Sequence, residues 1–175
     1  FYDEPTLARL SSVMRAVAPD IVLTHSPVDY MEDHTITCRL AVTAAFARGM
    51  PNFPVSPARP AIPQMVTLYH AHPYSNLDPL RRPVSPDLFV DVSDRLEDKV
   101  AMLAKHESQK LWLDESQGLD SYLQTLRGLD AEVGRLSGQF QYAEGWRRHL
   151  HLGFCEDNDD PLKVDLAGRV CEAKE

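Results

Sequence analysis

The sequence predicts one α/β domain over residues 1–175, Rossmann-like, with three layers and a mainly parallel sheet. Two observations predict this class. Short apolar runs alternate with longer segments of helical periodicity. Between residues 5 and 48 the order is helix, strand, loop, helix, which is the order of a doubly wound sheet. No strand precedes the first helix, so we expect the N-terminal strand of the sheet to be missing from this sequence.

The first helix is predicted from Pro5, which suits a first helical turn, to Pro19, which ends it. Apolar residues recur at helical spacing between them: Leu7, Leu10, Val13, Met14 and Val17. A short buried strand follows at 21–25, then a loop at 26–31 and a second helix over 32–48. The strand and loop therefore lie between two helices, as a parallel sheet requires.

The second half of the chain repeats the alternation after a proline-rich connection. Five prolines between residues 51 and 63 exclude regular structure there. Strands are predicted at 64–70 and 87–92. Asp94 and Glu97 form a candidate capping box for a long helix that ends near Trp112. A further amphipathic helix is predicted over 118–136, and the acidic segment 155–175 is expected to be loose.

Composition excludes several classes of partner. The net charge is −8 and no run of Lys or Arg exceeds two residues, so a nucleic-acid-binding face is not expected. The three cysteines are widely separated, which favours reduced thiols and a cytoplasmic protein over a disulfide framework or a zinc knuckle. No apolar run approaches the roughly 20 residues of a membrane span.

The segment with most chemistry lies at the end of the first predicted strand. His25, Asp29, Asp33 and His34 occur within ten residues. Open α/β sheets bind ligands at the carboxyl ends of their strands, and imidazole and carboxylate are zinc ligands. Two structural alternatives stay open: Asp33 caps the following helix, or His25 is a hydrogen-bonded residue at a strand end.

Three other groups are weaker candidates. His70 and His72, which alternate at a strand end, could share a metal or simply be a polar exit from the strand. His106 could line a cleft and bind substrate, or pack against the sheet. The segment 147–151, RRHLH, could bind an anion or form a solvated edge.

The segment PDIVLTHSPVDYMEDH, residues 19–34, resembles the second conserved block of the LmbE/PIG-L de-N-acetylase family. KVAMLAKHESQ at 99–109 and QYAEGW at 141–146 resemble later pieces, so the resemblance spans about residues 5–154. It implies a zinc-dependent hydrolase that removes an N-acetyl group from an amino sugar or a related small amide. Assembly into a homo-oligomer of identical copies is a separate alternative that the sequence leaves open. The rival interpretation is a degenerate, non-catalytic relative that binds sugar or serves as an oligomer partner.

The resemblance implies that His34 is a zinc ligand and that Asp33 is its neighbour at the helix start. We take His25, Asp29 and Asp33 as candidate catalytic residues and His106 as a candidate substrate-binding residue. The chain departs from the family in two ways: it contains no His-Pro-Asp-Asp-Glu motif, and Met31 stands where some members carry a histidine. We therefore expect the sequence to be the C-terminal part of a longer protein and to be inactive alone.

Overall fold

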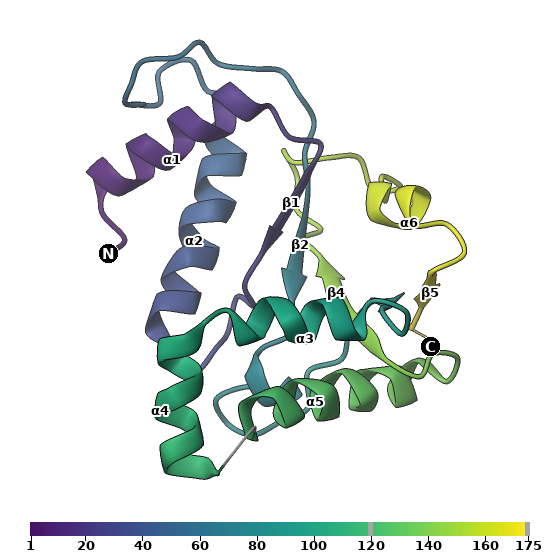
Figure 1. Ribbon diagram of the computed structural model, residues 1–175. Helices are drawn as coiled ribbons and strands as arrows, with labels where there is room; N and C mark the ends of the chain where they lie inside the picture. Colours follow the sequence, from purple (N-terminus) through teal and green to yellow (C-terminus); the bar gives the residue numbers. More distant parts are fainter. Residues whose placement is uncertain (119–120, 174–175) are drawn as a thin grey trace. The chain divides into compact units, whose positions relative to one another are not determined.

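The computed structural model describes residues 1–118 and 121–173 (Figure 1). Contacts divide the chain into two compact units. Unit 1 comprises Phe1–Ser85 and Trp146–Ala167, and unit 2 comprises Pro86–Gly145 and Gly168–Glu175. Compact units of this kind are not by themselves independent domains, so the single domain over 1–175 stays a prediction.

Unit 1 contains two long helices and the strands that carry the first half of the sequence. In chain order its elements are α1 (Glu4–Val17), β1 (Ile21–Thr24), α2 (Glu32–Ala47), β2 (Thr67–Ala71), the 3₁₀ turn η1 (Tyr74–Asn76), the second half of β4 (Ala143–Arg148) and α6 (Pro161–Asp165). Asp3 begins α1 by accepting the Thr6 N–H at 2.8 Å. The helix ends at Ala18, whose φ of 47° is left-handed, directly before Pro19.

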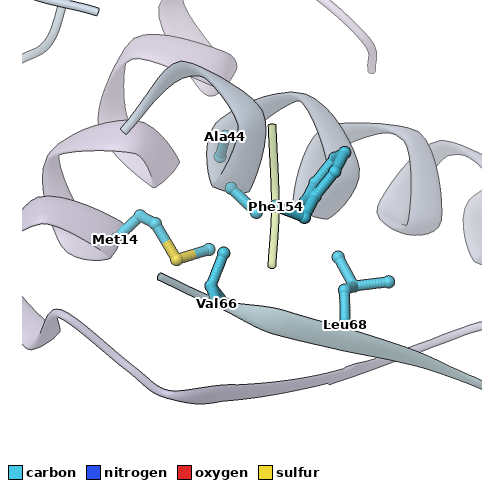
Figure 2. Packing of buried hydrophobic residues seen from close by; sticks show 6 residues of the cluster. Met14, Ala44, Val66, Leu68 and Phe154 are labelled. Atoms are coloured by element: carbon cyan, nitrogen blue, oxygen red, sulfur yellow. The ribbon is translucent and has the colours of Figure 1, made fainter. Parts of the chain in front are cut away.

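The core of unit 1 lies where α1 and α2 cover β2. Figure 2 shows its buried side chains, contributed by both helices, by the strand and by a segment after β4: Met14, Ala44, Ala45, Val66, Leu68 and Phe154. Leu7 and Leu10 of the predicted apolar stripe pack against this cluster. Val13 and Val17 do not join it, because they are 55% and 65% exposed.

Arg48 holds the return segment onto this core. Its side chain is buried, and the guanidinium donates to the carbonyl oxygens of Ala45 and Gly153 at 2.8 and 3.0 Å and of Phe154 at 2.9 Å. A buried guanidinium is tolerated only when its donors are satisfied, and these backbone acceptors satisfy them. One side chain thereby joins the end of α2 to residues more than 100 positions later in the sequence.

Unit 2 contains the remaining helices and strands. Its elements are β3 (Leu88–Asp91), α3 (Leu96–Ala104), α4 (Glu107–Gln117), α5 (Ser121–Ser137), the first half of β4 and β5 (Val170–Glu172). Phe89, Val133 and Ala143 form its buried cluster. Next to it, Lys99 Nζ donates to both carboxylate oxygens of Asp130, at 2.9 and 2.8 Å, and lies 2.7 Å from Glu144 Oε1.

The α/β class is confirmed, but the prediction of a mainly parallel sheet was wrong. The hydrogen-bonded strand order is β1-β2-β4-β3-β5. The β1–β2 pair is parallel, whereas β2–β4 and β3–β5 are antiparallel, so the sheet is mixed. The prediction failed because β4 has the sequence AEGWRR and is only partly buried. Charged, half-buried strands are typical of antiparallel pairing and carry no continuous apolar signal.

Two predicted segments also differ. The long helix over 94–112 is two helices, because the chain leaves helical geometry at His106, whose ψ is 62°. Asp94 and Glu97 do not form a capping box; they pair with Arg169 and Arg127 instead. The segment 155–175 was predicted to be loose or wrapped on the surface, and its described residues, 155–173, contain α6 and β5. Leu162 anchors α6 by burying its side chain.

Candidate functional site

The candidate site lies where β1 and β2 end. These strands are parallel neighbours with Thr24 opposite His70, so the loops that follow them leave at the same edge of the sheet. The first loop, residues 25–31, carries His25 and Asp29 and leads into α2, whose first turn carries Asp33 and His34. The second, residues 72–76, contains η1. This edge is where ligands bind in open α/β sheets.

Asp29 and His34 form the central contact of the site. The Asp29 side chain is only 2% exposed, and its Oδ1 lies 3.2 Å from His34 Nδ1. The same oxygen accepts the Met31 N–H at 2.8 Å. A carboxylate oxygen at this distance repels a lone pair, so the contact favours the tautomer of His34 that carries its proton on Nδ1. In the neutral ring, His34 Nε2 therefore keeps its lone pair, which is the form that binds a metal or accepts a proton.

The ring of His25 stacks on the ring of His34. Their centroids are 4.4 Å apart and their planes are parallel within 1°. Partial burial, reinforced by the neighbouring His34, lowers the pKa of His25 below its ordinary value. His25 is therefore a neutral imidazole at pH 7 and can offer a hydrogen-bond donor without adding charge.

Asp33 lies at the start of α2, next to His34, as predicted, but it does not cap that helix. It lies in the first turn of α2 with an exposed side chain, and no side chain caps that helix, whose N-cap residue is Met31. Among the described contacts, the carboxylate that touches His34 is that of Asp29, not that of Asp33. The negative charge of Asp33 still acts on the site through space, since it opposes the fall in the pKa of His25.

Two residues from neighbouring strands hold the loop that carries Asp29. His70, opposite Arg147 in the β2–β4 register, donates from Nδ1 to the His25 carbonyl oxygen at 2.9 Å. Arg147 donates to Ser26 Oγ at 2.8 Å, and Ser26 Oγ donates to the Val28 carbonyl oxygen at 2.8 Å. The start of the loop, at His25 and Ser26, is thus held by side chains of the sheet, and Ser26 in turn holds Val28.

The sequence did not reveal the partner of His70. With its Nδ1–H given to a carbonyl, the neutral ring of His70 accepts at Nε2, and His149 Nδ1 lies 2.9 Å away. Burial lowers the pKa of both imidazoles. This arrangement leaves no free lone pair on His70, so it argues against the alternative metal site at His70 and His72. The two histidines of the pair are 79 positions apart, and no local pattern links them.

His106 belongs to unit 2. It is the exposed residue directly before α4, and its side chain makes no capping hydrogen bond. Its role in substrate binding stays a prediction.

A catalytic zinc ion usually has three protein ligands and an open position. Over residues 1–118 and 121–173, no group of three or more His, Cys, Asp or Glu side chains is arranged to hold a metal ion. His34 Nε2 is one suitable nitrogen, but these residues do not make a complete zinc site. We therefore assign no reaction step to a metal. In the same described residues, no helix is long and apolar enough to cross a membrane.

Comparison with known proteins finds one curated relative and several solved structures of similar fold. No family model matches the chain. The diacetylchitobiose deacetylase of Thermococcus kodakarensis is 29% identical over 159 residues, which cover 83% of this chain and 51% of that protein. The chain is a relative of the LmbE-like diacetylchitobiose deacetylases. It spans about half the length of the curated relative that it matches.

Three solved structures are similar in fold to this chain. The N,N′-diacetylchitobiose deacetylase of Pyrococcus horikoshii, bound to its inhibitor, has a TM-score of 0.64 at 22% identity, covering 85% of this chain and 52% of that one. The conserved protein TT1542 of Thermus thermophilus has a TM-score of 0.63 at 20% identity, covering 89% and 63%. GalB, the 4-carboxy-2-hydroxymuconate hydratase of Pseudomonas putida, has a TM-score of 0.59 at 23% identity, covering 90% and 62%.

Proposed function

We propose that this chain carries part of the active site of a zinc-dependent deacetylase that removes an N-acetyl group from an amino sugar. The observation that supports it most is the Asp29–His34 contact at the carboxyl end of β1, which favours a lone pair on His34 Nε2. It occurs in a chain related to a diacetylchitobiose deacetylase. An N-acetylated sugar of that kind is the substrate class we propose.

Each residue at this edge has a proposed part. His34 Nε2 provides one zinc ligand, and the remaining ligands come from outside the cluster described above. Asp29 orients the His34 ring and keeps its tautomer. Neutral His25, stacked on His34, donates a hydrogen bond to the oxygen that becomes negative when the amide is attacked. The negative charge of Asp33 limits the fall in the pKa of His25. In this class of hydrolase, zinc lowers the pKa of its bound water toward about 7.

The test compares zinc content with deacetylation in the complete protein. Acetate release from N,N′-diacetylchitobiose is measured beside the zinc stoichiometry for the wild type, His34→Ala and the control His151→Ala, an exposed histidine. We expect His34→Ala to lose bound zinc and activity together and His151→Ala to keep both. Full zinc and full rate in His34→Ala would contradict the proposal. Sugar binding by the wild type without acetate release would favour a non-catalytic sugar-binding relative.

A further inference from the structure

Two tyrosines lie beside one another at the same edge of the sheet as the candidate site. Tyr30 follows Asp29 in the loop after β1, and Tyr74 begins η1 after β2. Their ring centroids are 6.0 Å apart and the planes are inclined by 51°. Because β1 and β2 are parallel neighbours, this contact joins the two loops at the carboxyl ends of the strands. We call Tyr30 and Tyr74 the tyrosine pair.

The tyrosine pair does not belong to the core. Tyr30 is 58% exposed and Tyr74 is 48% exposed, although a tyrosine ring in a core is covered. Val28 and Met31, on either side of Tyr30 in the same loop, are also exposed. Exposed aromatic and apolar side chains that lie next to one another are typical of a surface that binds a ligand or a partner protein. The packing of the core does not require them to be there.

The chemistry of the pair fits a sugar ring. One face of a pyranose presents C–H bonds that pack on an aromatic ring, while its hydroxyl groups need hydrogen-bonding partners. A tyrosine offers both an apolar face and a phenolic O–H. Partial burial and the nearby Asp29 raise the pKa of Tyr30, so its phenol stays neutral and keeps the donor. A neutral, amphipathic surface of this kind suits an uncharged saccharide.

The position of the pair relates it to the reacting group. Tyr30 is covalently next to Asp29, whose carboxylate contacts His34 Nδ1 at 3.2 Å. The Met31 N–H, one residue further, donates to the same Asp29 oxygen at 2.8 Å. The backbone that carries the Tyr30 ring is therefore fixed by the group that orients His34. A sugar packed on Tyr30 would therefore contact the same loop that carries Asp29.

We propose that the tyrosine pair is a saccharide subsite, in which Tyr30 and Tyr74 pack against a pyranose ring of the N-acetylated substrate. This inference rests on the proposed function and adds to it the part of the site that recognises the sugar, as distinct from the amide. Both tyrosines are positioning residues for the substrate and take no part in bond making or breaking.

Binding without turnover tests the subsite. The complete protein, treated with a chelator so that the sugar is not hydrolysed during the titration, is titrated with N,N′-diacetylchitobiose by NMR, and the dissociation constant of the sugar is compared among the wild type, Tyr30→Ala, Tyr74→Ala and the corresponding Phe variants. Tyr2→Ala is the matched control, because Tyr2 is also exposed but packs with Arg39 and Thr43 on the helices. We expect about a tenfold weaker affinity for each Ala variant, the effect of losing one stacked ring. The Phe variants and Tyr2→Ala should stay within about threefold of the wild type, since all three keep both aromatic rings of the pair.

The outcomes separate this inference from the proposed function. Tyr-dependent sugar binding in a complete protein that releases no acetate supports the subsite and contradicts only the deacetylase. Acetate release with unchanged affinity in both Ala variants overturns the subsite alone. The subsite is also overturned if sedimentation shows a dimer of the wild type that either Ala variant dissociates while sugar affinity is unaltered, because the pair would then be a contact between copies.

Discussion

Asp29 Oδ1 lies 3.2 Å from His34 Nδ1 and accepts the Met31 backbone N–H at 2.8 Å. One buried carboxylate oxygen therefore fixes both the orientation of the imidazole and the course of the loop that precedes α2. This double role distinguishes Asp29 from Asp33, which is exposed in the first turn of the helix.

We expect Asp29→Ala to release the ring of His34 from its single tautomer. The substitution removes the acceptor that keeps the proton on Nδ1, so both neutral tautomers should become populated. Histidine ¹⁵N chemical shifts at pH 8 report this directly. Asp33→Ala is the control and should leave the His34 shifts as they are. Identical changes in the two variants would show that negative charge near the ring, not the close contact with Asp29, sets the tautomer.

His70→Phe should reduce the free energy of unfolding by about 1–3 kcal/mol. The new ring fills the buried space but leaves the His25 carbonyl oxygen and His149 Nδ1 without their partner. Urea unfolding followed by the fluorescence of Trp146, which lies in β4 beside His70, measures the loss. His151→Phe, at an exposed histidine, should change stability by less than about 0.5 kcal/mol. Equal losses in both variants would contradict the interpretation of His70 as a buried anchor.

The stability of the protein should fall on mild acidification. Burial lowers the pKa of His70 and His149 below the ordinary value of 6.5. At pH values between the pKa values in the folded protein and 6.5, the unfolded chain binds more protons than the folded one. Lowering the pH in this range therefore favours the unfolded state. The histidine contribution is complete above pH 6.5 and decreases as the pH drops below it. Urea titrations at pH 7.5, 6.5 and 5.5 should show this decrease, and His70→Phe should reduce it; a rise in stability would refute the assignment.

Lys99→Met should destabilise unit 2 by about 3 kcal/mol, since it leaves the buried carboxylate of Asp130 without its cation. Burial alone would lower the pKa of Lys99, but the carboxylates of Glu144 and Asp130 outweigh it and raise the pKa. Arg127→Gln breaks the exposed pair with Glu97 in the same unit and should leave the thermal midpoint almost unchanged. The double variant Lys99→Met, Asp130→Leu should recover part of the loss, and no recovery would show that the pair is not the cause.

Local sequence was sufficient where an element carries its own signal. The apolar runs at 21–25 and 87–92 predicted β1 and β3, and the helical stripe at 118–136 predicted α5, with residues 119–120 of that stripe outside the described part of the chain. The gathering of His25, Asp29 and His34 in one loop followed from their short separation. Such features depend on backbone periodicity and on proximity along the chain.

Pairings between distant segments could not be predicted in this way. The strand β4, with the sequence AEGWRR, has no continuous apolar run, and only its antiparallel register with β2 places Arg147 beside His70. The choice between Asp29 and Asp33 as the partner of His34 depended on where α2 begins. A shift of one residue there would rotate Asp33 by about 100° around the helix axis.

Phe154 closes the core of unit 1, and its carbonyl oxygen accepts from both Val66 and Arg48. Synthesis on the ribosome proceeds from the N-terminus, so β1, α2 and β2 emerge well before this ring. Most of unit 2 is translated after β2 and before Phe154. During that time the apolar faces of α1 and α2 are not yet covered by Phe154. Closure over long sequence separations is slow and exposes apolar surface to other chains. We therefore expect chaperones to bind the nascent chain until residue 154 has left the ribosomal exit tunnel.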